Sequence, residues 1–354
     1  AEHGGVYDDP KIGGYVASVG GRLAANSEMT DYPFTFTVLN SPIVNAFALP
    51  GGYVYVTRGI LALFNDEAEL ASVLGHEIGH VTARHTAKRY NQSMFAGLGG
   101  AILGIATGSQ ALSQLANYGS QLYLLGYSRD QEYQSDELGI RYMTKAGYDP
   151  FGSPDMLRAL LAQDQLETLI AQRQNSERPP EFFSTHPNTE NRVQRATELA
   201  KTTGVQPGSR PRLADRYLEA IDGMIYGDDP EQGLIRGQVF WHPTLKFTFT
   251  APDNYQIFNT SQAVVMQGPQ GNVAQLVGAA AKSGETTEQV MQRTWSGIAK
   301  DVALQGAQKV TINGMEAVTA WARANSQQGP LIVRLLTIRY SPTQSYSFLM
   351  LTPE

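Results

Sequence analysis

The sequence contains no cysteine, and this absence limits the metal and redox chemistry that it can support. The fold cannot rest on disulfides, and a zinc site built from cysteine is excluded. Any bound metal must therefore use histidine, aspartate or glutamate. A chain without cysteine is also compatible with an exported bacterial protein.

Long apolar runs and basic charge are scarce as well. No stretch reaches the roughly 20 apolar residues that a membrane-spanning helix needs; the nearest, residues 94–107, is shorter and rich in glycine. The net charge of −6 argues against a nucleic-acid partner. With 42% hydrophobic and 17% charged residues, the composition is that of a globular protein.

The length of 354 residues predicts two domains rather than one core. We expect a first domain at residues 1–226, a linker rich in glycine, aspartate and proline at 227–237, and a second domain at 238–354. The first domain reads as mainly helical with a small, mostly antiparallel sheet, and the second as an antiparallel sheet with one helix. The predicted fold class is therefore α+β.

The first domain contains the motif H-E-x-x-H at residues 76–80. On an α-helix, His76 and His80 lie one turn apart on the same face, so both imidazoles can bind one metal ion. Glu77 can then face a water molecule on that ion. This is the pattern of zinc peptidases. The alternative is a buried helix that happens to carry two histidines.

The start and the packing of this helix can also be predicted. Asp66, followed by Glu69, predicts a capping box. An apolar stripe that should face the core, and leave the motif facing a cleft, is formed by Ala71, Leu74, Ile78 and Val81.

Glycine inside a helix lowers its stability and suggests that another element comes close. For Gly75 and Gly79 we expect that element to be the small sheet. His85, just beyond the motif, is expected to be structural or exposed.

A catalytic zinc site needs three protein ligands and an open fourth position for water. Glu132 and Asp136 share one face of a predicted helix that begins after Ser128. Paired acids on a helix usually form a solvated face, but the motif still lacks a third ligand, and we assign Glu132 to that role. Asp136 is then placed to accept the second N–H of a ligand histidine.

Proton transfer and stabilisation of the oxyanion can be assigned to a few further side chains. Glu77 can accept the proton of a metal-activated water and pass it to the leaving amine. His186, on a loop before a proline, or Arg192 can stabilise the oxyanion, although a lone loop histidine is more often a surface residue. A substrate peptide can add as an extra strand at residues 45–48 or 53–57.

Residues 94–115 carry glycine at every fourth position from 100 to 108. This pattern is typical of closely packed helices. A helical hairpin or a flap over the active site is one interpretation, and contact with a membrane surface or an envelope protein is the other.

Four blocks together resemble the HtpX/Oma/BepA-type family of zinc metallopeptidases. They are N-A-F-A-x-P-G-G at 45–52, H-E-I-G-H at 76–80 with R-H at 84–85, E-x-x-x-D at 132–136 with glycine at 139, and T-H-P at 185–187 with arginine at 192. The resemblance covers about residues 10–225.

The resemblance implies a gluzincin fold, one Zn²⁺ per chain and Glu132 as its third ligand. In relatives the loop at His186 can approach or bind the metal, which implies a possible regulatory fourth ligand. The multiple spans of the family's integral-membrane branch are not evident here, so the chain is most similar to the soluble bacterial envelope branch.

These observations predict a zinc-dependent endopeptidase with regulated or latent activity, acting on misfolded or misassembled envelope proteins. The first alternative is a zinc-bound chaperone-like or scaffold module with little proteolysis, and the second is a non-peptidase metal hydrolase. We expect polypeptide substrates, and a membrane or envelope-protein contact through residues 94–115 or the second domain. The expected location is the bacterial periplasm or cell envelope, with lipid anchoring before trimming as an open possibility.

Overall fold

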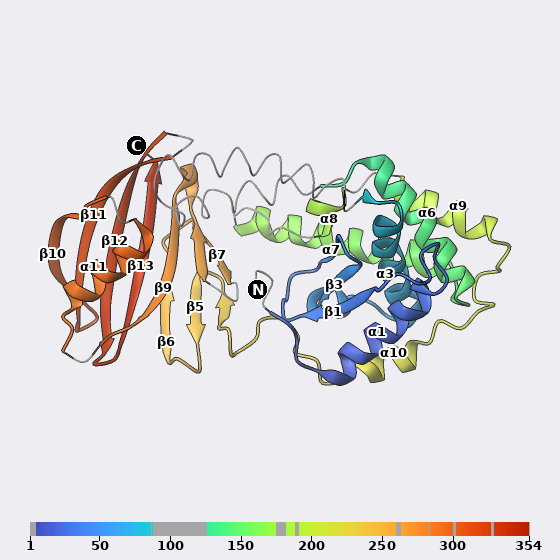
Figure 1. Cartoon of the computed structure of the whole chain (residues 1–354), viewed down its shortest axis with the longest axis horizontal. Coiled ribbons are helices and arrows are strands. Elements are labelled where there is room, and N and C mark those ends of the chain that lie inside the picture. Colours follow the sequence, from blue (N-terminus) through green and yellow to red (C-terminus); the bar gives the residue numbers. More distant parts are fainter. Residues whose placement is uncertain are drawn as a thin grey trace. The chain divides into compact units, whose positions relative to one another are not determined.

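The computed structural model describes residues 5–85, 87, 126–174, 182–187, 191–259, 263–282, 284–299, 302–326 and 329–353. These residues belong to two compact units, and the chain passes from the first to the second between Asp229 and Pro230 (Figure 1). Residues 94–115, the predicted flap or contact segment, lie outside the described part. None of the described helices has the length and apolarity needed to cross a bilayer.

The first unit combines helices with a small sheet. In chain order its elements are α1 (Pro10–Ala24), β1 (Thr35–Leu39), β2 (Ala46–Leu49), β3 (Tyr53–Thr57), α2 (Arg58–Leu61), α3 (Glu67–Thr82), α6 (Arg129–Lys145), α7 (Gly152–Gln174), α8 (Phe182–Thr185), α9 (Arg192–Thr202) and α10 (Ala214–Ile221).

The small sheet has the strand order β1-β3-β2 and is mixed rather than mostly antiparallel. Gly51 and Gly52 adopt φ values of 101° and 82°, which allows the tight turn of a β2–β3 hairpin. Strand β2 pairs with one edge of β3 in antiparallel direction, and β1 pairs with the other edge of β3 in parallel. The predicted antiparallel arrangement is therefore wrong for one of the two pairs. Of the two strands considered for substrate binding, β2 is an edge and β3 is central.

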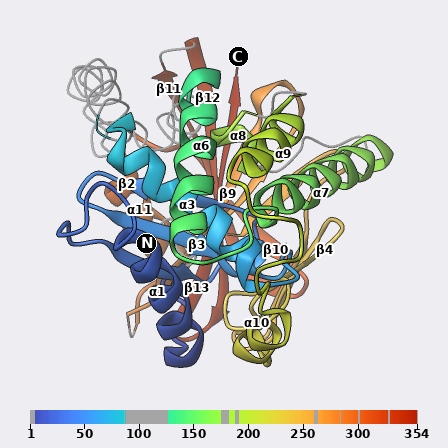
Figure 2. The same cartoon turned by 90° about the vertical axis from the view of Figure 1, so that its right-hand side faces the viewer.

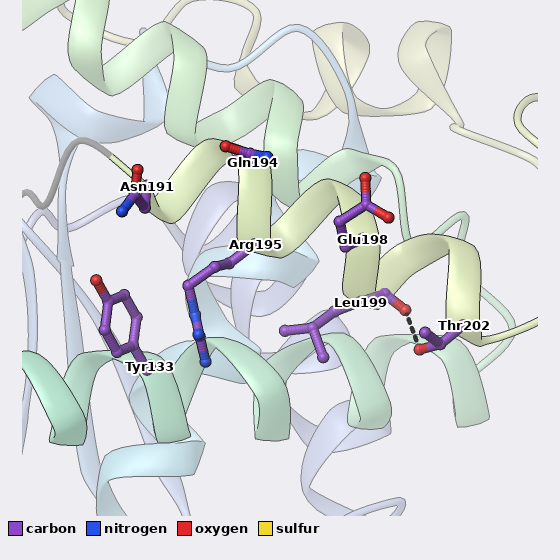
Figure 3. Close-up of a pocket in the computed structure, with 7 residues that line it drawn as sticks. All are labelled: Tyr133, Asn191, Gln194, Arg195, Glu198, Leu199 and Thr202. Atoms are coloured by element: carbon purple, nitrogen blue, oxygen red, sulfur yellow. Dashed lines mark hydrogen bonds between the residues drawn. The ribbon is translucent and has the colours of Figure 1, made fainter.

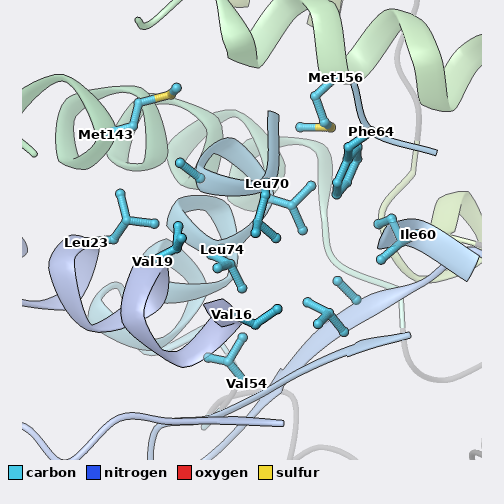
Figure 4. Packing of buried hydrophobic residues seen from close by; sticks show 14 of the residues in the cluster. Val16, Val19, Leu23, Val54, Ile60, Phe64, Leu70, Leu74, Met143 and Met156 are labelled. Atoms are coloured by element: carbon cyan, nitrogen blue, oxygen red, sulfur yellow. The ribbon is translucent and has the colours of Figure 1, made fainter. Parts of the chain in front are cut away.

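Helix α3 runs through the middle of the first unit, and every residue from Glu67 to Val81 is buried. Figure 4 shows how its residues Leu70 and Leu74 meet Val16 and Val19 of α1 and Val54 of β3. The predicted apolar stripe is part of this core. Because neighbours surround α3 on all sides, its polar motif residues must interact with one another or with a bound ion.

The cap of α3 forms as expected, with one change. The Asp66 side chain accepts the backbone N–H of Glu69 at 2.9 Å. The Glu69 carboxylate reaches back one residue further than in a standard capping box and accepts the N–H of Asn65 at 2.8 Å. Arg212 also pairs with Asp66 at 2.7 Å. The N-terminus of the motif helix is thus held in place by its cap and by this ion pair.

The second unit is dominated by antiparallel sheet. Its elements are β4 (Leu234–Arg236), β5 (Val239–His242), β6 (Phe247–Thr250), β7 (Gln256–Asn259), β8 (Val264–Gln267), the 3₁₀ helix η1 (Pro269–Gly271), β9 (Val273–Ala280), α11 (Thr287–Ile298), β10 (Gln305–Ile312), β11 (Met315–Ser326), β12 (Gly329–Ser341) and β13 (Gln344–Pro353). The seven-stranded sheet has the order β10-β11-β12-β13-β9-β8-β7, and β4, β5 and β6 form a separate sheet. Strand β4 falls inside the range 227–237 that was expected to be a linker.

Both faces of the large sheet are covered. On one face Trp295 of α11 packs in a cluster with Leu349, and on the other Phe249 of β6 contacts the ring of Phe348. Adjacent residues of β13 therefore pack in different cores, because successive side chains of a strand point to opposite faces of the sheet. Asn313 and Gly314, with φ values of 50° and 81°, form the hairpin turn between β10 and β11, and an Asn-Gly pair favours such a turn. The predicted α+β class is confirmed.

Candidate metal centre

Helices α3 and α6 pack unusually closely, and glycine makes this possible (Figure 2). A Cβ atom at Gly75 would lie 3.1 Å from the Cα of Gly139, and one at Gly79 would lie 3.1 Å from the backbone oxygen of Ser135. The prediction that the sheet approaches these glycines is wrong, because the neighbour is α6. This approach brings Glu132 on α6 within reach of the histidines of α3.

Four buried side chains from three segments converge on one point. His76 and His80 come from α3, Glu132 from the first turn of α6, and His186 from the residue after α8. The Nε2 atom of His76 lies 3.0 Å from Nε2 of His80 and 3.3 Å from Nδ1 of His186. Oε1 of Glu132 lies 3.3 Å from Nε2 of His80 and 3.0 Å from Nδ1 of His186.

This donor set fits a zinc ion. Zinc binds imidazole nitrogen and carboxylate oxygen at about 2.0–2.2 Å, so two donors on a tetrahedron around it are separated by about 3.4 Å. The measured separations of 3.0–3.5 Å agree with that value. Nitrogen lone pairs facing one another at such distances would repel without a cation between them. Nitrogen and oxygen donors without sulfur are also what the sequence composition requires.

A layer of charged groups holds the donors. Nδ1 of His76 lies 2.9 Å from Oδ1 of Asp136. Arg192 donates to both oxygens of Asp136, at 2.8 Å and 2.7 Å, and its Nη1 lies 2.8 Å from Oε2 of Glu132. Arg192, considered as an oxyanion group, is fully buried and is directed at these two carboxylates. Asp136 has the partner that was expected for it.

The ionisation of these groups suits a cation. Burial raises the pKa of Glu132, but the charges of His186, His76 and Arg192 outweigh it and hold that pKa well below its usual value. For Asp136 burial also raises the pKa, and Arg192 and His76 bring it below normal. Burial lowers the pKa of His80 well below its usual value, so this imidazole is neutral, as a metal ligand must be.

Surrounding negative charge also acts on His76. Burial lowers the pKa of His76, but Glu132 and Asp136 raise it more, so the net pKa is above its usual value. An environment that favours a proton on this imidazole favours a metal cation for the same electrostatic reason.

Glu77 and His186 lie side by side next to the donors. Glu77 is fully buried, and its Oε1 lies 3.5 Å from Nε2 of His186. The same nitrogen lies 3.3 Å from the backbone oxygen of Ala46 on β2. The His186 ring therefore spans the space between the donor set, Glu77 and the edge strand.

Comparison with known proteins identifies the family of this chain. The model of Peptidase family M48 matches residues 10–200, which is more than half of the chain. The chain belongs to this peptidase family. The predicted family is confirmed, and its use of zinc agrees with the donor set described above.

Several proteases are similar to this M48 chain over about half of its length. The β-barrel assembly-enhancing protease of Escherichia coli (strain K12) is 31% identical over 202 residues, which are 54% of this chain and 40% of the relative. That of Yersinia pestis is 31% identical, with 56% and 41% covered. The mitochondrial metalloendopeptidase OMA1 of Arabidopsis thaliana is 35% identical over 48% of this chain and 32% of its own. The chain thus spans less than half the length of these three relatives.

Among solved structures, PsbP from the cyanobacterium Synechocystis sp. PCC 6803 is similar to a part of the chain. It is 13% identical and covers 33% of this chain and 80% of its own length, with a TM-score of 0.27. A score at this level is too low to establish a shared fold.

Two aromatic side chains beside the M48 centre were not foreseen, and His85 has the structural rather than the exposed position among the two expected for it. The ring of Tyr127 stacks on His80 with a centroid distance of 3.6 Å, and that of Phe182 stacks on His186 at 4.4 Å. His85 is only 3% exposed, and its Nδ1 lies 3.2 Å from Nδ1 of His80. For His85 the signal was its position just past the motif; nothing local pointed to the two aromatic residues.

A surface groove lies where α9 crosses α6 (Figure 3). The guanidinium of Arg195 sits 4.2 Å from the ring centroid of Tyr133, a cation–π contact that joins the two helices. None of the four donors lines this groove, whose lining residues are Tyr133, Asn191, Gln194, Arg195, Glu198, Leu199 and Thr202. Its relevance to the metal centre is indirect, since the same helix α9 carries Arg192.

Proposed function

We propose that this chain is a zinc-dependent endopeptidase that hydrolyses peptide bonds of misfolded or misassembled polypeptides in the bacterial envelope. The observation that carries the proposal is the convergence of His76, His80 and Glu132 on one point, with Glu77 buried beside it. Relatives named as proteases support the reaction, and those named for β-barrel assembly support the envelope as the location.

Zinc in this site would polarise the scissile carbonyl and lower the pKa of a water molecule to near neutrality. Glu77 accepts the proton of the attacking water on a carboxylate oxygen and later donates it to the leaving amine. Asp136 and Arg192 act indirectly, since they hold His76 and Glu132 in place.

The activity is held latent by the segment that carries His186. Its imidazole takes the fourth position of the donor set, which a catalytic zinc site keeps open for water. The N–H of Phe182 donates to the backbone oxygen of Val44 at 2.9 Å, and Nε2 of His186 lies near the oxygen of Ala46. The oxygen of Asn45 accepts the N–H of Thr57, so the next oxygen, that of Ala46, points away from β3 at the edge of β2 where a substrate strand would pair. Substrate and this segment therefore compete for one edge.

The test uses casein cleavage together with measurement of bound zinc. The wild-type chain should cleave casein slowly, His186→Ala should cleave it faster, and Glu77→Gln should lose cleavage in both backgrounds while its zinc content is unchanged. If the wild type and His186→Ala both carry zinc and are both inert, the endopeptidase proposal fails. The alternative, a zinc-bound chaperone-like or scaffold module, would then be favoured.

For the second unit we propose a binding role toward an envelope partner. Residues 238–354 form most of this unit, which has its own cores and none of the four metal donors. A chain truncated after Asp229 should retain zinc and peptide cleavage but lose selectivity among protein substrates. Unchanged selectivity would contradict this role.

A further inference from the structure

The chain turns sharply where the motif helix ends. Helix α3 stops at Thr82, and Arg84 adopts a left-handed conformation with φ of 61°. This conformation is unfavourable for a residue with a side chain. Its consequence is that His85 folds back against the helix it has just left and becomes buried next to His80. A strained residue thus places an imidazole directly behind a metal donor.

His85 contacts both of the helices that carry the donors. Its Nδ1 lies 3.2 Å from Nδ1 of His80 on α3 and 3.4 Å from Oγ of Ser135 on α6. Its Nε2 lies 3.1 Å from Oε1 of Gln134 on α6. Neither nitrogen of His85 belongs to the donor set, which uses the opposite nitrogen of His80.

One arrangement of protons satisfies the contacts of His85 with His80 and Gln134 when zinc is bound. Nε2 of His80 must direct its lone pair at the metal, so the proton of this neutral ring is on Nδ1. That N–H donates to Nδ1 of His85, which is therefore an acceptor. The proton of His85 is then on Nε2, where it donates to the amide oxygen of Gln134. Each nitrogen and oxygen in this series has a compatible partner.

We propose that His85 is a positioning residue for His80, fixing the ring orientation and the tautomer that leave Nε2 free for zinc. Asp136 plays the corresponding part for His76, so the two histidines of the motif are supported by different chemistry, one by a carboxylate and one by a neutral imidazole. The proposal rests on the metal site of the proposed function but not on its proteolysis.

Zinc affinity of the full chain, measured by competition with a chromophoric chelator, is the test. His85→Leu removes the acceptor and should weaken zinc binding about 10- to 100-fold, the usual effect of losing such a partner. His85→Asn places its side-chain oxygen near the position of Nδ1 and should stay within a few-fold of wild type. Tyr217→Phe, which loses a buried hydrogen bond to the backbone of Leu61, should bind zinc normally.

Two spectroscopic readouts separate positioning from a merely structural role. Substitution with Co²⁺ should give an altered d–d spectrum in His85→Leu and a wild-type spectrum in His85→Asn. Nitrogen-15 chemical shifts of the zinc-loaded wild type should report a neutral His85 protonated at Nε2. If His85→Leu fails to fold, the nitrogen-15 shifts and the zinc affinity of His85→Asn still test the positioning role of His85.

Equal zinc affinity in wild type and His85→Leu would overturn the proposal, as would an equal loss in the leucine and asparagine variants. Both results leave the endopeptidase proposal intact, because the wild type would still bind zinc and could still cleave casein.

Discussion

Gly75 of α3 and Gly139 of α6 face each other so closely that a Cβ on Gly139 would lie 2.9 Å from the backbone nitrogen of His76. The glycine contact between the two helices therefore includes the backbone of His76, the first ligand of the motif. It sets the separation of the two helices, and through it the distance from Glu132 to His80. The metal centre thus depends on two residues that have no side chain.

Gly139→Ala should weaken the protein although alanine is the better helix former. The added methyl group has only backbone to push against, and overpacking of this kind costs about 1–3 kcal/mol. We expect lower stability in urea unfolding together with weaker zinc binding. Gly14→Ala is the matched control, since nothing lies within 4 Å of a Cβ there. It should stabilise α1 by up to about 1 kcal/mol and leave zinc affinity unchanged. A neutral Gly139→Ala would contradict the close-packing explanation.

Arg192→Leu should destabilise the first unit by about 3–5 kcal/mol, because it leaves two buried carboxylates without their shared cation. Arg192→Lys should recover only part of this loss, since lysine cannot form the paired hydrogen bonds to Asp136. Arg195→Leu, one turn further on the same helix, removes an exposed cation–π contact and should cost no more than about 1 kcal/mol. Thermal unfolding of the three variants, with zinc present, provides the comparison; similar losses at both arginines would count against the buried network.

Phe182→Leu should raise the peptidase activity a few-fold. Leucine keeps most of the apolar burial, but it cannot stack on the imidazole of His186 as the aromatic ring does at an interplanar angle of 13°. The imidazole should then leave the donor set more often. Phe183→Leu changes the neighbouring, partly buried ring and is the control. Cleavage of a fluorogenic peptide gives the rates, and unchanged activity in Phe182→Leu would argue against latency through this residue.

Removal of zinc should lower the stability of the first unit. A ligand present at 1,000 times its dissociation constant stabilises the folded state by about 4 kcal/mol, and this contribution is lost with a chelator. All three tryptophans, Trp241, Trp295 and Trp321, lie in the second unit, whose cores include none of the donors. Circular dichroism should therefore show a transition that shifts with chelator, while tryptophan fluorescence should not. Zinc restored after chelation should reverse the shift.

Glu285 should make the free energy of unfolding of the second unit sensitive to acid. Hydrogen bonds from Arg293, and from the N–H of Lys282, lower the pKa of this partly buried carboxylate to about 2. Because the folded pKa is lower than the unfolded one, the stabilisation is complete above about pH 4.5 and is lost as the pH falls toward 2. Urea unfolding followed by tryptophan fluorescence should show a smaller decline over this range in Glu285→Gln than in wild type. Parallel curves would rule this carboxylate out as a source of the acid sensitivity.

Local features of the sequence determined the elements that carry the motif. The helical repeat alone puts His76 and His80 on one face, and the caps at Asp66 and Ser128 start both donor helices where the residue pattern predicts. The turn at Asn313 and Gly314 follows from their tolerance of positive φ. Each of these depends on backbone geometry within a turn or two of the chain, and for that reason each can be read from a short stretch.

Only the tertiary structure decided which surfaces meet. Gly75 and Gly79 indicate that another element packs closely, but the sequence does not determine whether that element is the sheet or α6. The parallel pairing of β1 with β3 likewise depends on where β2 is placed. The position of His186 in the donor set and of His85 behind His80 likewise depends on packing between segments distant in sequence or on one left-handed residue. Complementary surfaces and strained backbone conformations have no local periodicity, and this is the physical reason that the sequence alone could propose the metal but could not describe what surrounds it.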